Sequence, residues 1–357
     1  MKEFKTVLFA ALLALCQAAS GAEGDLLDAR DSQDAPIPII LDTDIGGDID
    51  DAFALALIHR FADVGACELL AVTLTNKRPD AARYVAAENA LYGRPEIPVG
   101  QPQEAARDTD NYPSAVLALK NADGTARYPV PDKFEVQEPI ALLRRTLASA
   151  QDRSVVFIQI GFSTNLAALL DSPGDAVSPL TGAELVAKKA RILSVMGGAF
   201  ALDPELKQYA GMREWNIIND IPAAQKLARE WPGEIVFGGS EIGERIRLSS
   251  VSLKRDYRSR PAKFLRDAFS WWASKNAPDE GLNHERPAWD LTSVFFVVRP
   301  EEGRGYFQLS EPGFVSFDDE GAATFTPDAN GKHRVFLIDG TNAVRVREAF
   351  VNLCSEP

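Results

Sequence analysis

The sequence predicts an α/β protein with a mostly parallel open sheet and helices on both faces. The first indication is an alternation of short apolar runs with amphipathic stretches: IPIILD precedes DDAFALALIHRFA, and ELLAVTL precedes PDAARYVAAENALYG. Short β-rich runs followed by helical periodicity indicate βαβ units, whose strands pair in parallel. The second is that polar residues follow several of these runs. Ligands of such sheets bind outside the carboxyl ends of the strands, so these residues mark the candidate site.

The N-terminal segment MKEFKTVLFAALLALCQAASGA predicts a signal peptide over residues 1–22. Two lysines precede an apolar run from Val7 to Leu15, and small residues lead to a cleavage position after Ala22, which is the layout of a secretory signal. A lipoprotein modified at Cys16 is an alternative, although a leucine precedes that cysteine where a small residue is expected. We therefore expect a secreted or periplasmic protein with no membrane span, because the apolar run is too short to cross a bilayer.

The remaining chain predicts a single domain. Residues 23–35 are polar and indicate a flexible lead-in. Residues 36–357 then form one domain, because 357 residues that are 46% hydrophobic suffice for one large core. The runs SVVFIQI, ARILSVMGG and GEIVFGG continue the alternation, and a helical, aromatic segment spans residues 254–288. From about residue 303 onward, short strands separated by turn residues predict a small antiparallel C-terminal extension.

Charge and cysteine content limit the possible partners. The formal net charge is −13 and the isoelectric point is near 4.9. Nucleic acids and anionic membrane surfaces select for basic patches, so a small neutral or cationic ligand is expected instead. Beyond the signal peptide, only Cys67 and Cys354 remain. We expect buried free thiols, and pairing in an oxidising compartment is the alternative.

The segment DTDIGGDIDD places five aspartates within ten residues, directly after the first predicted strand. They are Asp42, Asp44, Asp48, Asp50 and Asp51. Crowded carboxylates repel one another unless a cation or a shared proton lies among them. Helix capping by Asp48 or Asp50, at a helix beginning near Ala52, explains one or two of the five. The cluster therefore predicts a cation site or a site that handles protons.

Two known motifs fit this cluster poorly. An EF-hand loop that began at Asp42 would need a bidentate glutamate where Phe53 stands, and no helix precedes it. An aspartyl-phosphate-type phosphatase motif has the right strand and D-x-D pair, but Gly46 falls where threonine or valine is usual.

Four further segments follow in order: AVTLTNKRPDAARY, IQIGFSTNLAALL, REWNIINDIPAAQKL and RPAWDLTSVFFVV. Together with the aspartate cluster they resemble the motifs of the inosine-uridine-preferring nucleoside hydrolases, from about Ile39 to Pro300. Two departures stand out near the first motif. Ile45 replaces the usual proline, and two extra residues separate Asp44 from the Asp50–Asp51 pair. The resemblance implies a nucleoside hydrolase-like fold with a Rossmann-like core, and it suggests a homo-oligomer.

The resemblance also implies a calcium site and a sugar site. It places the metal ligands at Asp44, Asp51, Asp290 and the backbone carbonyl of Ile160. Calcium takes oxygen ligands and lowers the pKa of a bound water, and Asp44 is placed to deprotonate that water as the catalytic base. Sugar hydroxyls favour charged acceptors and amides. The implied sugar contacts are Asp50, Asn76, Glu214, Asn216 and Asp290.

The leaving-group side departs from the family pattern. Trp289 stands where many members carry a histidine that acts on the departing base, and an indole N–H cannot deliver a proton at neutral pH. Of the three histidines, His284 is the candidate to reach the pocket, and a solvated loop histidine is the favoured alternative, since His59 is predicted to lie on a helix face and His333 in a C-terminal strand. Stacking of the base on Trp289, Trp271 or Trp272 is the alternative, although the last two are adjacent and cannot both face it.

The sequence therefore predicts a calcium-dependent enzyme that hydrolyses the N-glycosidic bond of ribonucleosides, with purine or broad specificity, in nucleoside salvage. The absent histidine leaves two alternatives open. The substrate is another ribosyl compound with a better leaving group, or the protein is a secreted calcium-dependent ribose- or nucleoside-binding protein with little catalysis.

Overall fold

The computed structural model describes residues 35–102, 111–249, 259–298 and 306–355. Residues from Pro36 to Pro357 form one compact unit. The predicted signal peptide, Cys16 and nearly all of the predicted lead-in lie outside the described residues, so these features and the secreted location stay predictions. Among the described residues, no helix is long and apolar enough to cross a membrane.

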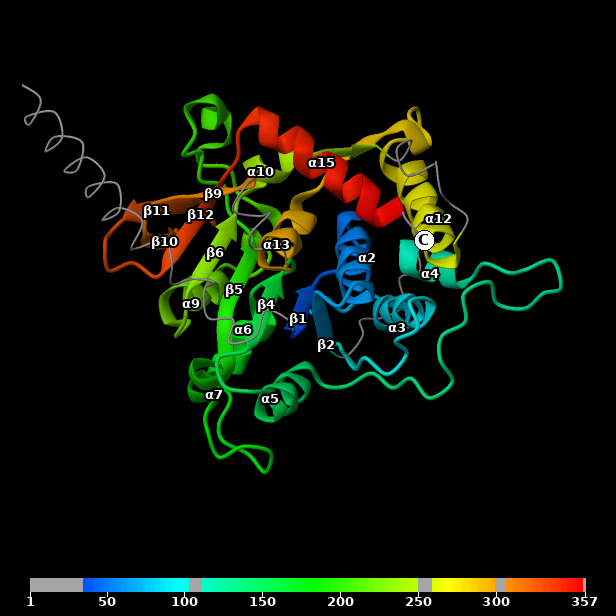
Figure 1. The fold of residues 1–357 in the computed structure, drawn as a ribbon, viewed down its shortest axis with the longest axis horizontal. Helices are drawn as coiled ribbons and strands as arrows, with labels where there is room; N and C mark the ends of the chain where they lie inside the picture. The colour runs from blue at the N-terminus through cyan, green and yellow to red at the C-terminus, as the bar shows by residue number, and fades with distance from the viewer. Residues whose placement is uncertain (1–34, 103–110, 250–258, 299–305, 356–357) are drawn as a thin grey trace, which may run out of the picture. The chain divides into compact units, whose positions relative to one another are not determined.

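The central feature is a ten-stranded mixed sheet with the order β11-β10-β12-β6-β5-β4-β1-β2-β3, and β9 pairs with β12 at its side (Figure 1). Its parallel strands are β1 (Ile37–Thr43), β2 (Cys67–Leu74), β3 (Val99–Gly100), β4 (Val155–Gln159), β5 (Ala190–Met196), β6 (Ile235–Gly238) and β12 (His333–Leu337). The antiparallel strands are β9 (Gln308–Leu309), β10 (Gly313–Phe317) and β11 (Ala323–Pro327). The predicted fold class is confirmed.

Helices cover both faces of this sheet. On one face, α5 (Pro139–Ser149), α6 (Thr164–Asp171), α7 (Gly182–Lys189) and α9 (Ile221–Glu230) contact one another and the strands. On the other lie α2 (Asp50–Asp63), α3 (Ala81–Leu91), α10 (Ser240–Glu244), α13 (Trp289–Val298) and α15 (Gly340–Ser355). Further elements are α4 (Tyr112–Leu117), α8 (Trp215–Ile218), α12 (Arg260–Asn276), two 3₁₀ turns (Pro204–Tyr209 and Gly281–Asn283) and the pair β7 (Arg247–Ser249) and β8 (Glu285–Pro287).

Burial explains the apolar runs. Strand β1 lies between β2 and β4 with helices on both sides, so nearly all of its residues are buried and its sequence is almost continuously apolar. Helix α13, with the sequence WDLTSVFFVV, is hydrophobic on every side, and all of its residues after Trp289 are buried. These two elements bring Asp44 and Asp290 to the same region, because one follows β1 and the other lies in the first turn of α13.

The C-terminal region is more integrated than the sequence predicted. Strands β9 to β11 are antiparallel, as expected, but β12 runs parallel to β6 and extends the main sheet. The final helix α15 was not predicted, and it packs against α2. Because β12 and α15 cover part of the core, these residues are an integral part of the domain.

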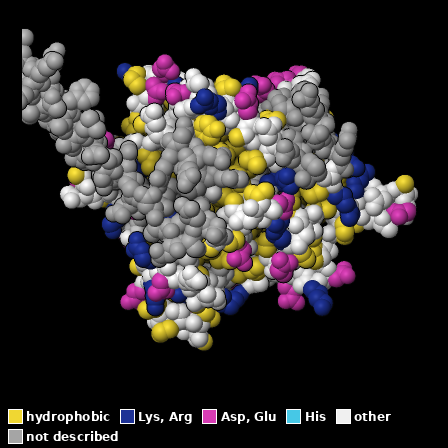
Figure 2. Space-filling view, in the orientation of Figure 1, with side chains coloured by type: hydrophobic (Ala, Val, Ile, Leu, Met, Phe, Trp, Pro, Cys, Tyr) yellow, Lys and Arg dark blue, Asp and Glu magenta, His cyan; other side chains and the backbone are white. Residues whose placement is uncertain are grey.

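Two smaller predictions have clear outcomes. Cys67 and Cys354 are both buried free thiols, as expected. His59 lies within the first helix, as predicted, but on a buried face. His59 is fully buried, its Nε2 lies 2.8 Å from Oδ1 of Asn89 on α3, and its ring stacks on Tyr92. On the face shown in Figure 2, acidic and basic side chains of the described residues are interspersed.

Glu88 on α3 provides a test of the core. Its side chain is fully buried, and neither carboxyl oxygen has a hydrogen-bonding partner among the described residues. Burial raises its pKa well above the ordinary value of 4.5. The folded state therefore holds a proton that the unfolded chain releases, so stability is full below the ordinary pKa and falls as the pH rises toward the raised one.

We expect Glu88→Gln to remove this pH dependence. Between about pH 5 and the raised pKa, the wild-type protein should lose up to about 1.4 kcal/mol of unfolding free energy per pH unit relative to the variant. Urea unfolding at several pH values measures the difference, with Glu68→Gln on an exposed position of β2 as the control. Parallel curves for wild type and Glu88→Gln would contradict the assignment.

Candidate active site

A cavity of about 640 Å³ opens at the carboxyl edge of the parallel sheet. Strands β1, β4, β5 and β6 contribute Asp44, Ile160, Met196 and Ser240, which lie at the ends of these strands or one to two residues beyond. Ligands of open parallel sheets bind at this edge. The first turns of α2 and α13 and the loop before α8 also contribute to the lining, so predicted site residues converge from distant parts of the sequence.

Asn76 holds the loop that carries Asp44. Its Nδ2 donates to the carbonyl oxygens of Asp44 at 2.5 Å and Ile45 at 3.1 Å, and its Oδ1 accepts from the backbone N–H of Arg78 at 2.8 Å. Asn76 is not one of the residues that line the cavity. Its predicted contact with the sugar stays a prediction, whereas its observed contacts fix the backbone beside Asp44.

Gly161 permits the loops after β1 and β4 to meet. A Cβ atom at this position would lie 2.6 Å from the backbone nitrogen of Asp44 and 2.7 Å from the carbonyl carbon of Thr43. Contacts this short do not occur in folded proteins, so a side chain here would displace the backbone that carries Asp44.

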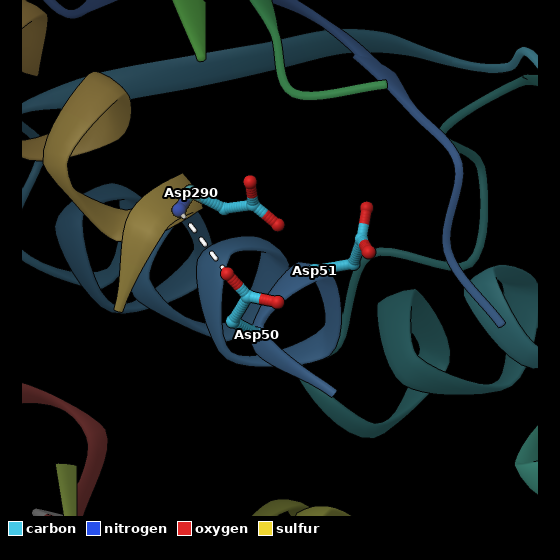
Figure 3. A group of neighbouring side chains, drawn as sticks. All are labelled: Asp50, Asp51 and Asp290. Carbon is cyan, nitrogen blue, oxygen red and sulfur yellow. Dashed lines mark hydrogen bonds between the residues drawn. The ribbon is translucent and has the colours of Figure 1, made fainter. Parts of the chain in front are cut away.

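Three buried aspartates form the acidic centre of the cavity. Asp50 and Asp51 open α2, Asp290 lies in the first turn of α13, and one carboxylate oxygen of each lies within 4.8 Å of the others (Figure 3). The backbone N–H of Asp290 donates to Oδ2 of Asp50 at 3.3 Å, and the Thr43 hydroxyl donates to Asp51. Such an oxygen-only group could hold a metal ion.

Electrostatics favour a cation at this place. Burial raises the pKa of Asp44 to about 7 and that of Asp50 to about 8. Burial, and then the neighbouring carboxylates, raise the pKa of Asp51 and Asp290 well above their ordinary values. Four buried carboxyl groups cannot all ionise at neutral pH unless positive charge lies among them. A divalent ion would satisfy this condition.

The structure places some, but not all, of the predicted calcium ligands and sugar contacts in the aspartate triad. Asp51 and Asp290 belong both to the predicted calcium cage and to the observed triad. Asp50, predicted to bind the sugar, completes the triad, whereas Asp44 lines the same cavity and interacts electrostatically with Asp51 and Asp290. The Ile160 carbonyl accepts a hydrogen bond from Nδ2 of Asn216 at 3.0 Å, which leaves one lone pair for another partner.

Glu214 and Asn216 also line the cavity. The Glu214 carboxylate caps α8 by accepting from the backbone N–H groups of Asn216 at 2.8 Å and Ile217 at 3.2 Å, and it also accepts from Gly198 at 3.2 Å. Burial raises its pKa to about 7. The capping geometry explains the E-x-N spacing, because the Glu214 carboxylate accepts the Asn216 N–H and both residues then line the cavity from one turn.

The aromatic wall differs in part from the prediction. Trp289 lines the cavity, and its indole N–H donates to the Ser240 carbonyl at 2.9 Å. Trp272 also lines the cavity, whereas Trp271 does not, because successive residues on α12 face different directions. Trp271 is therefore not placed to contact a bound base, and Trp272 is the candidate instead. His284 reaches the cavity, with Nδ1 at 3.0 Å from a Glu280 carboxylate oxygen.

Sequence reasoning missed a charged pair in this cavity. Asp48 does not cap α2, since the N-cap residue is Ile49 and no side chain caps the helix. Asp48 instead accepts from Nε of Arg286 at 3.0 Å and from Nη2 of the same guanidinium. Arg78 also lines the cavity. The basic residue within NHERPAWD was a visible signal, but its partner lies 238 residues away.

Similar solved structures share this architecture. The plant nucleoside hydrolase PpNRh1 has a TM-score of 0.65 at 21% identity, with 90% of this chain and 100% of that chain covered. A purine-preferring ribonucleoside hydrolase from Gardnerella vaginalis has a TM-score of 0.65 at 19% identity, with 89% and 99% covered. The type III effector XopQ, solved with adenosine diphosphate ribose, has a TM-score of 0.62 at 15% identity, with 91% and 94% covered. At these identities the similarity shows the fold. A comparison with curated protein sequences gave no match.

Fold and family together define a hydrolase that acts on N-glycosyl compounds. The family model described as inosine-uridine preferring nucleoside hydrolase matches residues 39–346, and the chain belongs to this family. The resemblance seen in the sequence is thereby confirmed. The match also continues beyond Pro300, where the sequence motifs ended, and includes β9 to β12 and part of α15.

We expect Gly161→Ala to lower the free energy of unfolding by about 1–3 kcal/mol, because the added methyl group overlaps the backbone at Thr43 and Asp44. Urea unfolding measures the loss. The matched control is Gly340→Ala at the start of α15, where a Cβ would meet nothing within 4 Å. Equal effects of the two substitutions would show that the β1 and β4 loops do not require the glycine.

Proposed function

We propose that this protein is a calcium-dependent N-ribohydrolase that releases the base from ribonucleosides, with purine or broad specificity. The observation that carries the proposal is the cavity itself. A buried acidic centre, Asp50, Asp51 and Asp290, lines the same open cavity as Glu214 and Asn216. The proposed metal-holding and sugar-holding groups therefore share one cavity, whose volume suits a nucleoside.

The metal ligands proposed are Asp44, Asp51, Asp290 and the carbonyl oxygen of Ile160. Calcium fits this donor set because all four groups offer oxygen and because buried carboxylates with raised pKa values need a positive partner. When bound, the ion supplies positive charge that offsets carboxylate repulsion and lowers the pKa of nearby water. Asp50 is proposed to stay with the sugar, since one of its oxygens already accepts the Asp290 N–H.

Residues of the chain carry out proton transfer and sugar binding. Asp44 takes a proton from the attacking water, and the Asn76 and Gly161 contacts keep its backbone in place. Glu214, Asn216, Asp50 and Asp290 hold the sugar hydroxyls, which positions the anomeric carbon for attack. The transition state resembles an oxocarbenium ion, and the surrounding carboxylates stabilise its positive charge.

The test is ribose release by the mature protein, purified from Glu23 onward, with inosine, adenosine, uridine and p-nitrophenyl riboside, each with and without a chelator. Turnover of nucleosides that the chelator abolishes is the expected result. We expect Asp44→Asn to lower kcat by about 100-fold or more, the usual scale for loss of a general base. The exposed Asp279→Asn is the control. Ribose binding without turnover of any substrate would favour the binding-protein alternative instead.

A second test separates the proposed ligands from the observed triad. Saturating calcium should raise the thermal midpoint of the wild-type protein, and a concentration of 100 times Kd corresponds to about 2.7 kcal/mol. We expect Asp51→Asn, Asp290→Asn and Asp44→Asn to lose most of this shift and Asp50→Asn to keep it. The shift on adding calcium is compared within each variant, because removing a buried carboxylate changes baseline stability. If Asp50→Asn loses the shift and Asp44→Asn keeps it, the proposed ligand set is wrong and the triad is the site.

A further inference from the structure

Arg286 is held in the cavity from three sides. Its Nε donates to Oδ1 of Asp48 at 3.0 Å, and its Nη2 donates to Oδ2 of the same carboxylate. Its Cζ lies 5.0 Å from the ring centroid of Trp272 and 4.6 Å from that of Trp289. Ion pairing of two parallel N–H groups fixes the plane of a guanidinium, and aromatic faces hold its charge by cation–π attraction. These contacts together fix the position and the plane of the Arg286 guanidinium.

The Nη1 group of Arg286 takes no part in these contacts. Asp48 uses Nε and Nη2, and no described residue accepts from Nη1. Arg286 lines the same cavity as the acidic centre and Glu214. A guanidinium has five N–H donors, so this residue keeps donors for a ligand after its own fixing contacts are made.

Trp289 and His284, which lie beside Arg286 in the cavity lining, already make contacts of their own. The Trp289 N–H donates to Ser240, one side of this tryptophan packs so closely on Gly243 that a Cβ there would lie 2.2 Å from the ring, and Arg286 lies over its ring. A base that stacks on Trp289 would compete with the guanidinium. His284 pairs with Glu280 through Nδ1, so its Nε2 remains for another partner. Trp289 thus contacts and positions Arg286. Arg78 also lines the cavity, but its charge acts on Asp44, so Arg286 is the permanently charged donor beside the two tryptophans.

We propose that Arg286 is the catalytic residue that contacts and stabilises the leaving base, an inference that rests on the proposed function. The C1′–N bond breaks and its electron pair goes to the base nitrogen. The water oxygen bonds to C1′, and the proton it loses goes to Asp44. An arginine does not release its proton at any physiological pH, so it donates hydrogen bonds to the base and offsets its negative charge. The base departs as an anion and is protonated by solvent. The class of substrate favoured is a nucleoside whose base spreads negative charge over ring nitrogens or carbonyl oxygens.

The experiment compares two leaving groups in three proteins: wild type, Arg286→Gln and the control Arg229→Gln, whose side chain is 66% exposed on α9. p-Nitrophenolate departs without help, whereas hypoxanthine from inosine needs it. We expect Arg286→Gln to lower kcat/KM for inosine by about 100-fold, as for loss of one donor to a developing anion. The p-nitrophenyl riboside should lose much less. Arg286→Lys should recover part of the inosine activity, and Asp48→Asn, which frees the guanidinium, should show the same selective loss at smaller size.

The outcomes separate the two proposals. If the wild type turns over neither substrate, the proposed function fails, and this inference fails with it. If the wild type is active and Arg286→Gln lowers kcat/KM equally for both substrates, or for neither, the role of Arg286 is overturned while the proposed function stands. The pH profile adds a second readout. If Arg286 stabilises the leaving base, the wild-type kcat/KM for inosine should not decline on the alkaline side of neutrality. A decline that His284→Gln abolishes would show that His284 acts on the leaving base, and it would overturn the inference.

Discussion

The arrangement of this molecule depends on the mutual repulsion of buried carboxylates at one edge of its sheet. Asp44, Asp50, Asp51 and Asp290 are all buried, and each raises the cost of ionising the others. Carboxylates separated from water in this way destabilise a fold unless they are protonated or paired with a cation. A cation among these carboxylates would supply the missing charge, so the stability of the fold is expected to depend on protonation or occupancy of this site.

The surrounding structure holds these groups together against that repulsion. Asp42, which lies in strand β1 two residues before Asp44, accepts from the Thr73 hydroxyl at 2.5 Å and from Nδ2 of Asn165 at 2.8 Å. Asn165 also donates to the Leu74 carbonyl, so one amide links β1, β2 and the start of α6. These neutral donors do not offset charge. They fix the backbone, and a fixed backbone keeps ligands of like charge close enough to share one ion.

The fold class was predictable from local apolar patterns, and the acidic residues of the site were predictable from short motifs. Strand β1 is recognisable because it is apolar along its length, whereas the E-x-N turn at Glu214 was identified by its resemblance to a family motif, and the structure shows that Glu214 caps that turn. Three features had no local signal. The pairing of Asp48 with Arg286 joins segments 238 residues apart, the choice between Trp271 and Trp272 depends on the rotation of α12, and the burial of His59 depends on packing against α3. Each is decided by tertiary packing, which residue spacing does not encode.

Two departures from the family pattern, the longer first motif and Trp289, have a common physical consequence. The added residues before Asp50 include the stretch around Asp48, and Asp48 is the carboxylate that holds Arg286. Trp289, which occupies the place of the expected histidine, offers the flat face on which Arg286 lies. A histidine there would give a titratable donor, whereas a tryptophan supports a donor with permanent charge. The longer loop and the tryptophan therefore act together, since each contributes one of the contacts that fix the same guanidinium.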